Sequence, residues 1–434
     1  MSLPTSAEVV VVGAGPVGMT AALGLHKHAC PDVVVLDGQL TGENTSRALA
    51  VHAATLDTLA DLDVADRVVG SGRKLSTTTV WTKGQPPIST TYFPPLGKYT
   101  KYPFILGIAQ HVTEQILHDA CSERGIHIHR PHKVVDLKPS DDPAFTDVIL
   151  DNGHVIRTRC VVAANGSRTI IRQLCNVGWS DPTGELKSVS PNDEAEAANM
   201  VVADVTFKSP PPLKPDAINL VHTSSNALMC IYFPGDPYPD AVPSGTPVYR
   251  IATGVPRELG APPSAPGTDY LQPLLDRYGP HVTVWSSRFR THSAIADRFF
   301  AHVGETAGTG PVCFLGDAAH VHPPMGGQGM NLGIRDAAKL APVLAEYVAA
   351  ARAGTASQTA LEAWAAQRRK RALEVINFVK DLQRRLWLST DTKYVLGLIP
   401  YNPAWVQMSV LRVLSSFEWF QTKAAYTVSG LADS

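Results

Sequence analysis

The chain has 434 residues, of which 44% are hydrophobic, 18% charged and 7% aromatic, and its formal net charge is -1. This composition is typical of a folded soluble protein of roughly two or three domains, and it excludes a disordered chain. The near balance of 38 basic and 39 acidic side chains provides no strong field, so we expect neither nucleic acid nor a charged membrane surface as a partner.

The first 40 residues predict a strand, a tight glycine turn, a helix and a second strand. The apolar run Val9 to Val12 leads into Gly13-Ala14-Gly15-Pro16-Val17-Gly18, and Val33 to Leu36 follows an Ala/Leu-rich stretch. Continuous apolar strands are typical of a parallel sheet that helices cover on both faces. The pattern therefore predicts a βαβ unit and an α/β fold.

The next elements leave this domain and return to it. His52 to Val69 is predicted as one helix, and Ser76 to Tyr102 is rich in Thr, Ser, Pro and Tyr, with a strand-like piece inside it. Helical periodicity returns from His111 to Arg124. Paired strands near 133–150 and a buried strand at 160–164 then resume the first domain.

Four strand-like segments separated by Pro, Gly and Ser turns predict a mainly antiparallel sheet. They are Asn199–Phe207, Ala217–His222, Ala227–Phe233 and Val248–Gly254. Residues 310–348 then read again as strand, glycine turn and helix. The remainder is mainly helical, and the basic run Arg368 to Arg371 is predicted to be a solvated helix face.

These elements predict a Rossmann-like domain in three parts, with an inserted β-sheet domain and a helical end. The first domain comprises 1–75, 106–185 and 291–350; residues 76–105 are an excursion toward the inserted domain, 186–290 form that domain, and 351–434 are helical.

The first glycine motif indicates a dinucleotide site. Gly13, Gly15 and Gly18 lie where a strand turns into a helix, and glycine permits both the turn and close approach of a diphosphate. The free N–H groups of the helix N-terminus favour phosphate binding. Asp37, 19 residues past Gly18, is placed to accept hydrogen bonds from an adenosine ribose.

A second element distinguishes this chain from a simple NAD dehydrogenase. Phe314-Leu315-Gly316-Asp317-Ala318-Ala319-His320 leads into Pro323-Pro324-Met325-Gly326-Gly327-Gln328-Gly329-Met330-Asn331-Leu332-Gly333. This segment resembles the GDAAH, double proline and glycine turn of the class A flavoprotein monooxygenases, the para-hydroxybenzoate hydroxylase and phenol hydroxylase superfamily. The resemblance implies an FAD-binding domain of the glutathione-reductase type.

Other positions agree with that family in order. Arg47 and Gln110 resemble its FAD-contacting arginine and glutamine, and Ala163 to Arg172 resembles its GADGxxSxxR motif. Asn165 replaces the usual aspartate of that motif, which affects its pyridine-nucleotide role more than FAD binding. The predicted cofactor contacts are Gly13, Gly15, Pro16, Val17, Gly18, Asp37, Arg47, Gln110, Asn165, Asp317, Pro324, Gly327, Gly329, Met330 and Asn331.

Residues that act on the substrate are harder to identify from the sequence. His292 and Arg290 follow the last strand of the inserted sheet, and His222 and Tyr232 lie on earlier strands. We predict these four, with Pro324 beside the reactive flavin carbon, as the catalytic residues. The competing interpretation is a core histidine, a core aromatic residue or a surface ion pair.

The sequence lacks the patterns typical of a metal site, of a secreted protein and of a membrane protein. The H-x-H pairs, such as His320 and His322, have no third ligand at a supporting spacing, so we expect no metal. Six dispersed cysteines, the lack of a leader and the lack of an apolar stretch of about 20 residues predict a cytoplasmic protein. A monomer or a homodimer fits equally well.

The resemblance implies an FAD-dependent monooxygenase in which NADH or NADPH reduces the flavin and O2 forms a C4a-hydroperoxide that hydroxylates a phenolic or other activated ring. Epoxidation, ring expansion or dearomatisation of a secondary metabolite stays open, as does a non-catalytic FAD-binding protein. The WxWxIP motif of flavin halogenases is absent. The sequence leaves open the substrate, the hydroxylated position and the choice between NADH and NADPH.

Overall fold

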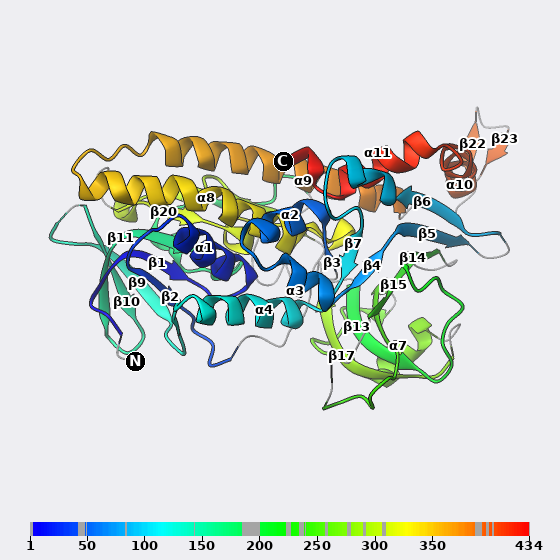
Figure 1. The fold of residues 1–434 in the computed structure, drawn as a ribbon. Coiled ribbons are helices and arrows are strands. Elements are labelled where there is room, and N and C mark those ends of the chain that lie inside the picture. Colours follow the sequence, from blue (N-terminus) through cyan, green and yellow to red (C-terminus); the bar gives the residue numbers. More distant parts are fainter. Residues whose placement is uncertain are drawn as a thin grey trace.

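The molecule contains two large β-sheets, which lie at opposite ends of the view in Figure 1. The computed structural model describes residues 3–41, 48, 50–82, 85–142, 144–184, 200–222, 227–233, 238, 240–256, 259–275, 279–289, 292–305, 310–386, 393–395, 399–401 and 403–433.

The first sheet is built on the parallel strands that the N-terminal sequence predicts. Its spatial order is β19 (Phe300–Ala301), β20 (Val312–Phe314), β11 (Val155–Ala163), β1 (Ser6–Val12), β2 (Val33–Leu36) and β8 (Ile128–His129), and β10 (Thr146–Leu150) and β9 (Val134–Pro139) extend from β11. β1 runs parallel to both β2 and β11. The carboxyl ends of these central strands therefore meet at one edge, where a ligand of an open α/β sheet binds.

Helices cover this sheet. α1 (Pro16–Lys27) packs against both α4 (Gln110–Glu123) and α8 (Gln328–Arg352), and α9 (Thr359–Leu386) runs along α8 (Figure 1). Gly24 of α1 meets Ala341 of α8, so the two helices approach closely. The short helices are α2 (Ala53–Asp61), α3 (Ala65–Gly70) and α5 (Ile171–Leu174).

The second sheet is mainly antiparallel. Its order is β17 (His281–Phe289), β13 (Met200–Phe207), β16 (Val248–Gly254), β15 (Ala227–Phe233), β14 (Ala217–His222), β5 (Thr77–Thr82) and β6 (Ile88–Tyr92). One face packs on α7 (Thr268–Leu275), and the other packs on α2 and α11 (Glu418–Val428). Sequence positions 77–92 thus contribute two strands to a sheet that is otherwise built from residues 200–289.

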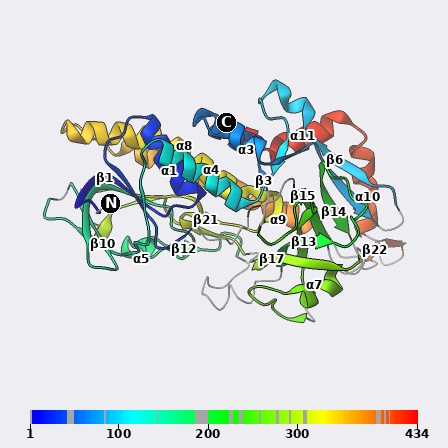
Figure 2. The ribbon, with the colours of Figure 1, turned by 60° about the horizontal axis from the view of Figure 1, so that its bottom comes forward.

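Smaller elements join the two parts. β3 (Ala50–Val51), β7 (Ile105–Gly107) and β4 (Arg73–Leu75) form one small sheet, and β12 (Trp179–Ser180), β18 (Ala294–Ala296) and β21 (His320–Val321) form another. Figure 2 shows β12 and β21 between the two large sheets. The chain ends with the hairpin β22 (Lys393–Val395) and β23 (Ile399–Tyr401), then α10 (Pro403–Leu414), α11 and the short helix η7 (Leu431–Asp433).

The element predictions are confirmed for α4 and for strands β13 to β16, but two others are wrong. The predicted helix from His52 to Val69 is broken between α2 and α3, where Asp63 adopts a left-handed conformation with φ of 58°. Arg368 is not on a solvated face: it is 1% exposed and bonds Asp336 and Asp433. Charge composition alone does not reveal such burial.

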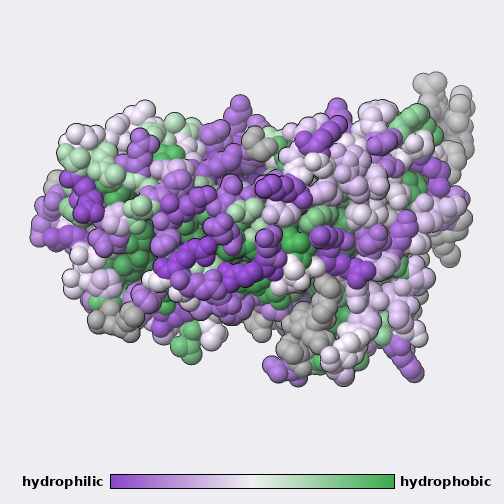
Figure 3. Space-filling view, in the orientation of Figure 1, coloured by the Kyte–Doolittle hydropathy of each residue, from purple (hydrophilic) through white to green (hydrophobic). Residues whose placement is uncertain are grey.

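On the face shown in Figure 3, hydrophilic side chains predominate and apolar ones form separate patches. Among the helices that the structure describes, none is both long enough and apolar enough to cross a bilayer.

Candidate active site

The glycine turn after β1 has two kinds of glycine. A Cβ on Gly18 would lie 1.8 Å from the Gly13 carbonyl oxygen, and Gly13, with φ of 107°, lies against the backbone of Ala164. A Cβ on Gly15 would meet no atom within 4 Å. Gly13 and Gly18 are therefore required by the fold, whereas Gly15 leaves open space at the N-terminus of α1.

Asp37 closes this turn from the end of β2. Its Oδ2 accepts a hydrogen bond from the Ala14 N–H at 2.8 Å, and its Oδ1 accepts one from the Gln39 N–H at 2.8 Å. Each oxygen keeps a second lone pair, so the carboxylate can both brace the turn and accept from a ligand.

Arg130, which the sequence analysis missed, lies beside Asp37. Its Nη2 donates to the Ala14 carbonyl at 3.2 Å and lies 3.5 Å from Asp37 Oδ2. Nε and Nη1 are buried and have no partner among the described residues. These two donors point to an acceptor, such as a phosphate or a ribose, that the chain itself does not supply.

The loop before β3 is held by one side chain of α4 and one of the second sheet. Gln110 Oε1 accepts from the Ala48 N–H at 2.9 Å, and the Ala48 carbonyl accepts from Arg250 Nη1 at 2.6 Å. Arg250 is fully buried in a pair with Asp204. Arg47 lies outside the described residues.

The GDAAH segment and the second glycine turn form the opposite wall. Asp317 is exposed after β20, and Gly327, with φ of 62°, caps α8. Asn331 is buried: its Oδ1 accepts from the His52 N–H, and its Nδ2 donates to the carbonyls of Ala50 and Gly327. Both amide hydrogens of Asn331 are thus used to position the turn.

These walls enclose a cavity of about 460 Å³. From the predicted cofactor set it is lined by Gly15, Pro16, Val17, Gln110, Asp317, Pro324, Gly327, Gly329 and Met330. Gly13, Gly18, Asp37 and Asn331 support the turns behind it. Asn165 is exposed and does not line the cavity, although Ala164 and Gly166 do.

Residues from the second sheet complete the cavity. Ser287, Arg288 and Phe289 of β17 line it, together with the buried His292. Arg290 and the side chain of His222 lie outside the described residues. Tyr232 does not reach this cavity: it lines a separate one of about 290 Å³ and packs against Tyr249 and the Arg73 guanidinium. The alternation of side chains along β15 explains this, because Tyr232 shares the outer face with Cys230.

Two buried histidines near the cavity are held neutral. Burial lowers the pKa of both His52 and His322 to about 4, and the nearby charge of Arg335 adds to the effect at His52. The neighbouring His320 bonds Asp336 through Nε2 at 2.8 Å. In the part of the chain that the structure describes, no three His, Cys, Asp or Glu side chains are grouped to hold a metal.

These pKa shifts predict acid sensitivity. The ordinary histidine value is 6.5, so between about pH 6.5 and 4 the unfolded chain binds protons that the folded His52 and His322 do not. Stability should therefore fall as the pH falls through this window. Urea unfolding at a series of pH values measures it. His52→Gln should reduce the slope of the free energy of unfolding against pH, whereas His26→Gln, at an exposed histidine, should leave it unchanged. Equal slopes in the wild type and both variants would contradict the pKa assignment.

Comparison with known proteins agrees with this geometry. A family model described as an FAD binding domain matches residues 6–379. The chain is 27% identical over 377 residues to rifampicin monooxygenase of Streptomyces venezuelae, covering 85% of this chain and 70% of that one. It is 31% identical over 375 residues to 6-methylpretetramide 4-monooxygenase of Streptomyces rimosus, covering 83% of this chain and 59% of that one.

A solved structure shows the same fold over nearly the whole length. The p-nitrophenol 4-monooxygenase of Pseudomonas putida matches with a TM-score of 0.76 at 21% identity, over 99% of each chain.

Proposed function

The chain belongs to the FAD-binding family of flavin-dependent aromatic monooxygenases, and from this premise we propose that it hydroxylates a phenolic or otherwise activated aromatic ring. One atom of O2 enters a ring C–H bond and the other leaves as water, while NAD(P)H and a proton supply the two electrons and the two hydrogens of that water. The observation that carries the proposal is a single cavity that both glycine turns line. Residues of β17, in the second sheet, and His292 line the same cavity.

The residues present fit FAD. Gly15 leaves space where a diphosphate approaches the first turn of α1, and Arg130, beside Asp37, has two buried donors that no described residue bonds. We assign the adenosine diphosphate half to Gly15, Asp37 and Arg130. The flavin half is assigned to Gln110, Asp317 and the first turn of α8.

FAD supplies the activation of O2 after its reduction. The chain contributes orientation and charge stabilisation: the N-terminus of α8 opens on the cavity at Gly327 and Gly329, and its positive end would stabilise negative charge on a bound flavin ring. Pro323 and Pro324 form a wall without N–H donors, which disfavours ordered water. Arg168 and Arg288 line the cavity and supply positive charge for a pyridine nucleotide.

The relatives leave the ring unspecified, since their names range from p-nitrophenol to rifampicin. Epoxidation, ring expansion and dearomatisation use the same oxygen chemistry and remain alternatives. A cytoplasmic location and a monomeric or homodimeric state stay predictions.

The deciding experiment measures NAD(P)H consumption by the FAD-loaded protein against phenols, benzoates and fused-ring phenols, with products identified by mass. Stimulated oxidation with a gain of one oxygen supports the proposal. A yellow protein whose NAD(P)H oxidation no ring compound stimulates contradicts it.

Replacing Arg130 by methionine should weaken FAD binding by about 10- to 100-fold, because charge-assisted hydrogen bonds to phosphate contribute about 1.5 to 3 kcal/mol. Quenching of FAD fluorescence measures the dissociation constant. ADP should displace FAD from the wild type and bind poorly to Arg130→Met. The exposed Arg67→Met is the control and should bind FAD normally; unchanged affinity in Arg130→Met would remove Arg130 from the site.

A further inference from the structure

We propose that Nε2 of His322 is the acceptor that holds the hydroxyl group of a phenolic substrate and takes its proton during oxygen transfer. This assignment rests on the proposed hydroxylation, and it names a residue that the sequence analysis left without a role.

The ring of His322 has one nitrogen committed and one available. Nδ1 lies 2.9 Å from the Pro323 carbonyl oxygen, and because a carbonyl only accepts, Nδ1 must carry the hydrogen. Nε2 then carries a lone pair. It is buried, and no described residue bonds it. A buried acceptor without a partner costs about 1 to 3 kcal/mol, so a ligand that supplies an O–H group gains affinity there.

The position of this ring is that of a substrate contact. His322 directly follows β21, which pairs antiparallel with β18 through Val321 and Ala294. His292 precedes Ala294 by two residues, so this pairing brings the two histidines to the same part of the cavity, which both line. His322 also abuts the first turn of α8, since a Cβ on Gly329 would lie 4.0 Å from its Cε1. The ring of His322 therefore lies between His292, which we assign to the substrate, and the first turn of α8, which we assign to the flavin.

The electrostatics keep Nε2 an acceptor. Burial lowers the pKa of His322 to about 4, the Pro323 hydrogen bond opposes this, and the neighbouring His320 lowers it further. The other titratable groups lining the cavity are Arg168, Arg288, His292 and Asp317. At neutral pH the ring is uncharged and ready to accept a hydrogen bond.

The proton balance is complete. As the new carbon–oxygen bond forms, the ring becomes electron-poor and its original hydroxyl becomes strongly acidic, so that proton moves to Nε2. The hydrogen on the hydroxylated carbon then leaves to water as aromaticity returns, and Nε2 gives its proton back to the oxygen. His322 is thereby regenerated in its neutral form.

The test compares 2-naphthol with 2-methoxynaphthalene, a pair with the same rings in which only the first has an O–H group. Dissociation constants are measured on the FAD-loaded protein from perturbation of the flavin spectrum. Wild type should prefer the naphthol by about 10-fold, the equivalent of one hydrogen bond of about 1.4 kcal/mol. His322→Leu should bind both compounds equally, and His322→Gln, whose amide oxygen can accept, should recover part of the preference.

Every outcome decides between the assignments. An undiminished preference in His322→Leu overturns the role of His322, and loss of the preference only in His292→Leu transfers it to His292. If the FAD-loaded wild type binds neither compound, the phenol site itself is refuted, and the proposed function fails with it. If wild type binds both equally, the hydroxylation proposal survives and the acceptor role of His322 does not.

Discussion

Replacing Asp336 by alanine should lower the free energy of unfolding by about 3 to 5 kcal/mol, the usual cost of removing one partner from a buried ion pair. Asp336 is completely buried on α8. Its Oδ1 accepts from Arg368 Nε at 2.6 Å and its Oδ2 bonds His320 Nε2 at 2.8 Å. The alanine variant leaves the Arg368 guanidinium and His320 with polar atoms that water cannot reach.

Denaturant unfolding of the protein measures this loss. Glu374→Ala is the matched control, because Glu374 also pairs with an arginine of α9, Arg371, but is exposed; its loss should stay below about 1 kcal/mol. Asp336→Asn keeps the shape and one acceptor oxygen, so it should fall between the two. Equal stabilities for Asp336→Ala and Glu374→Ala would show that the buried pair contributes nothing.

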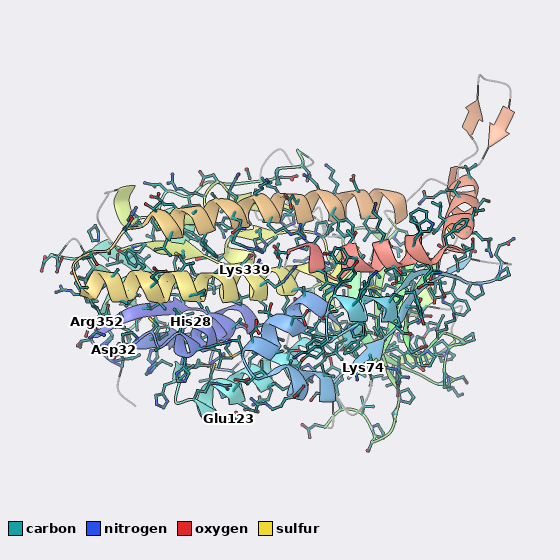
Figure 4. All side chains as sticks on the ribbon, turned by 45° about the horizontal axis from the view of Figure 1, so that its top comes forward. His28, Asp32, Lys74, Glu123, Lys339 and Arg352 are labelled. Atoms are coloured by element: carbon teal, nitrogen blue, oxygen red, sulfur yellow. The ribbon has the colours of Figure 1, made fainter. Side chains whose placement is uncertain are left out.

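The same cluster joins the active-site turn to the end of the described chain. Arg368 makes a two-pronged pair with Asp433 of η7, and Arg335 also bonds Asp433. Lys339, labelled in Figure 4, donates to the Asp433 carbonyl from α8. The chain of contacts from His320 through Asp336 and Arg368 to Asp433 therefore fixes η7 against the helix whose first turn lines the cavity.

Local signals explain what the sequence could predict. The strand Val9 to Val12, the glycines after it and the strands β13 to β16 are encoded within short windows by apolar runs and turn residues. The GDAAH segment and the second glycine turn, read as one motif, predicted the wall that carries Asp317 and Gly327.

The failures concern contacts between distant segments. Burial of Arg368 depends on Asp433, 65 residues later, and Arg130 faces the glycine turn 116 residues earlier. Tyr232 was expected at the substrate, but the strand register turns it to the outer face. A local sequence pattern does not reveal which distant residue pairs with a charged side chain. It also does not reveal which way a side chain points on a strand that has a hydrophobic core on each of its faces.

Gly15→Ala should abolish useful FAD binding, with affinity falling by more than about 100-fold, while the apoprotein keeps its stability. Gly15 has φ of -76° and ψ of -178°, which alanine adopts without strain, and its new methyl group would meet no protein atom within 4 Å. The methyl group would instead enter the space where the diphosphate approaches α1. Alanine has fewer conformations than glycine in the unfolded chain, which favours folding, but it is a poorer N-cap for α1, so the stability of the apoprotein should stay nearly unchanged.

Gly18→Ala separates this effect from loss of the fold. Its methyl group would lie 1.8 Å from the Gly13 carbonyl oxygen, a backbone atom that cannot move aside. The apoprotein should lose about 1 to 3 kcal/mol or more through overpacking. Urea unfolding without FAD should show that Gly15→Ala is stable and that Gly18→Ala is unstable. Fluorescence titration with FAD should show that Gly15→Ala does not bind FAD. Normal FAD affinity in a stable Gly15→Ala protein would mean that the diphosphate does not cross this turn, because among its three glycines, Gly13, Gly15 and Gly18, only Gly15 combines a permitted backbone with open space beside the cavity.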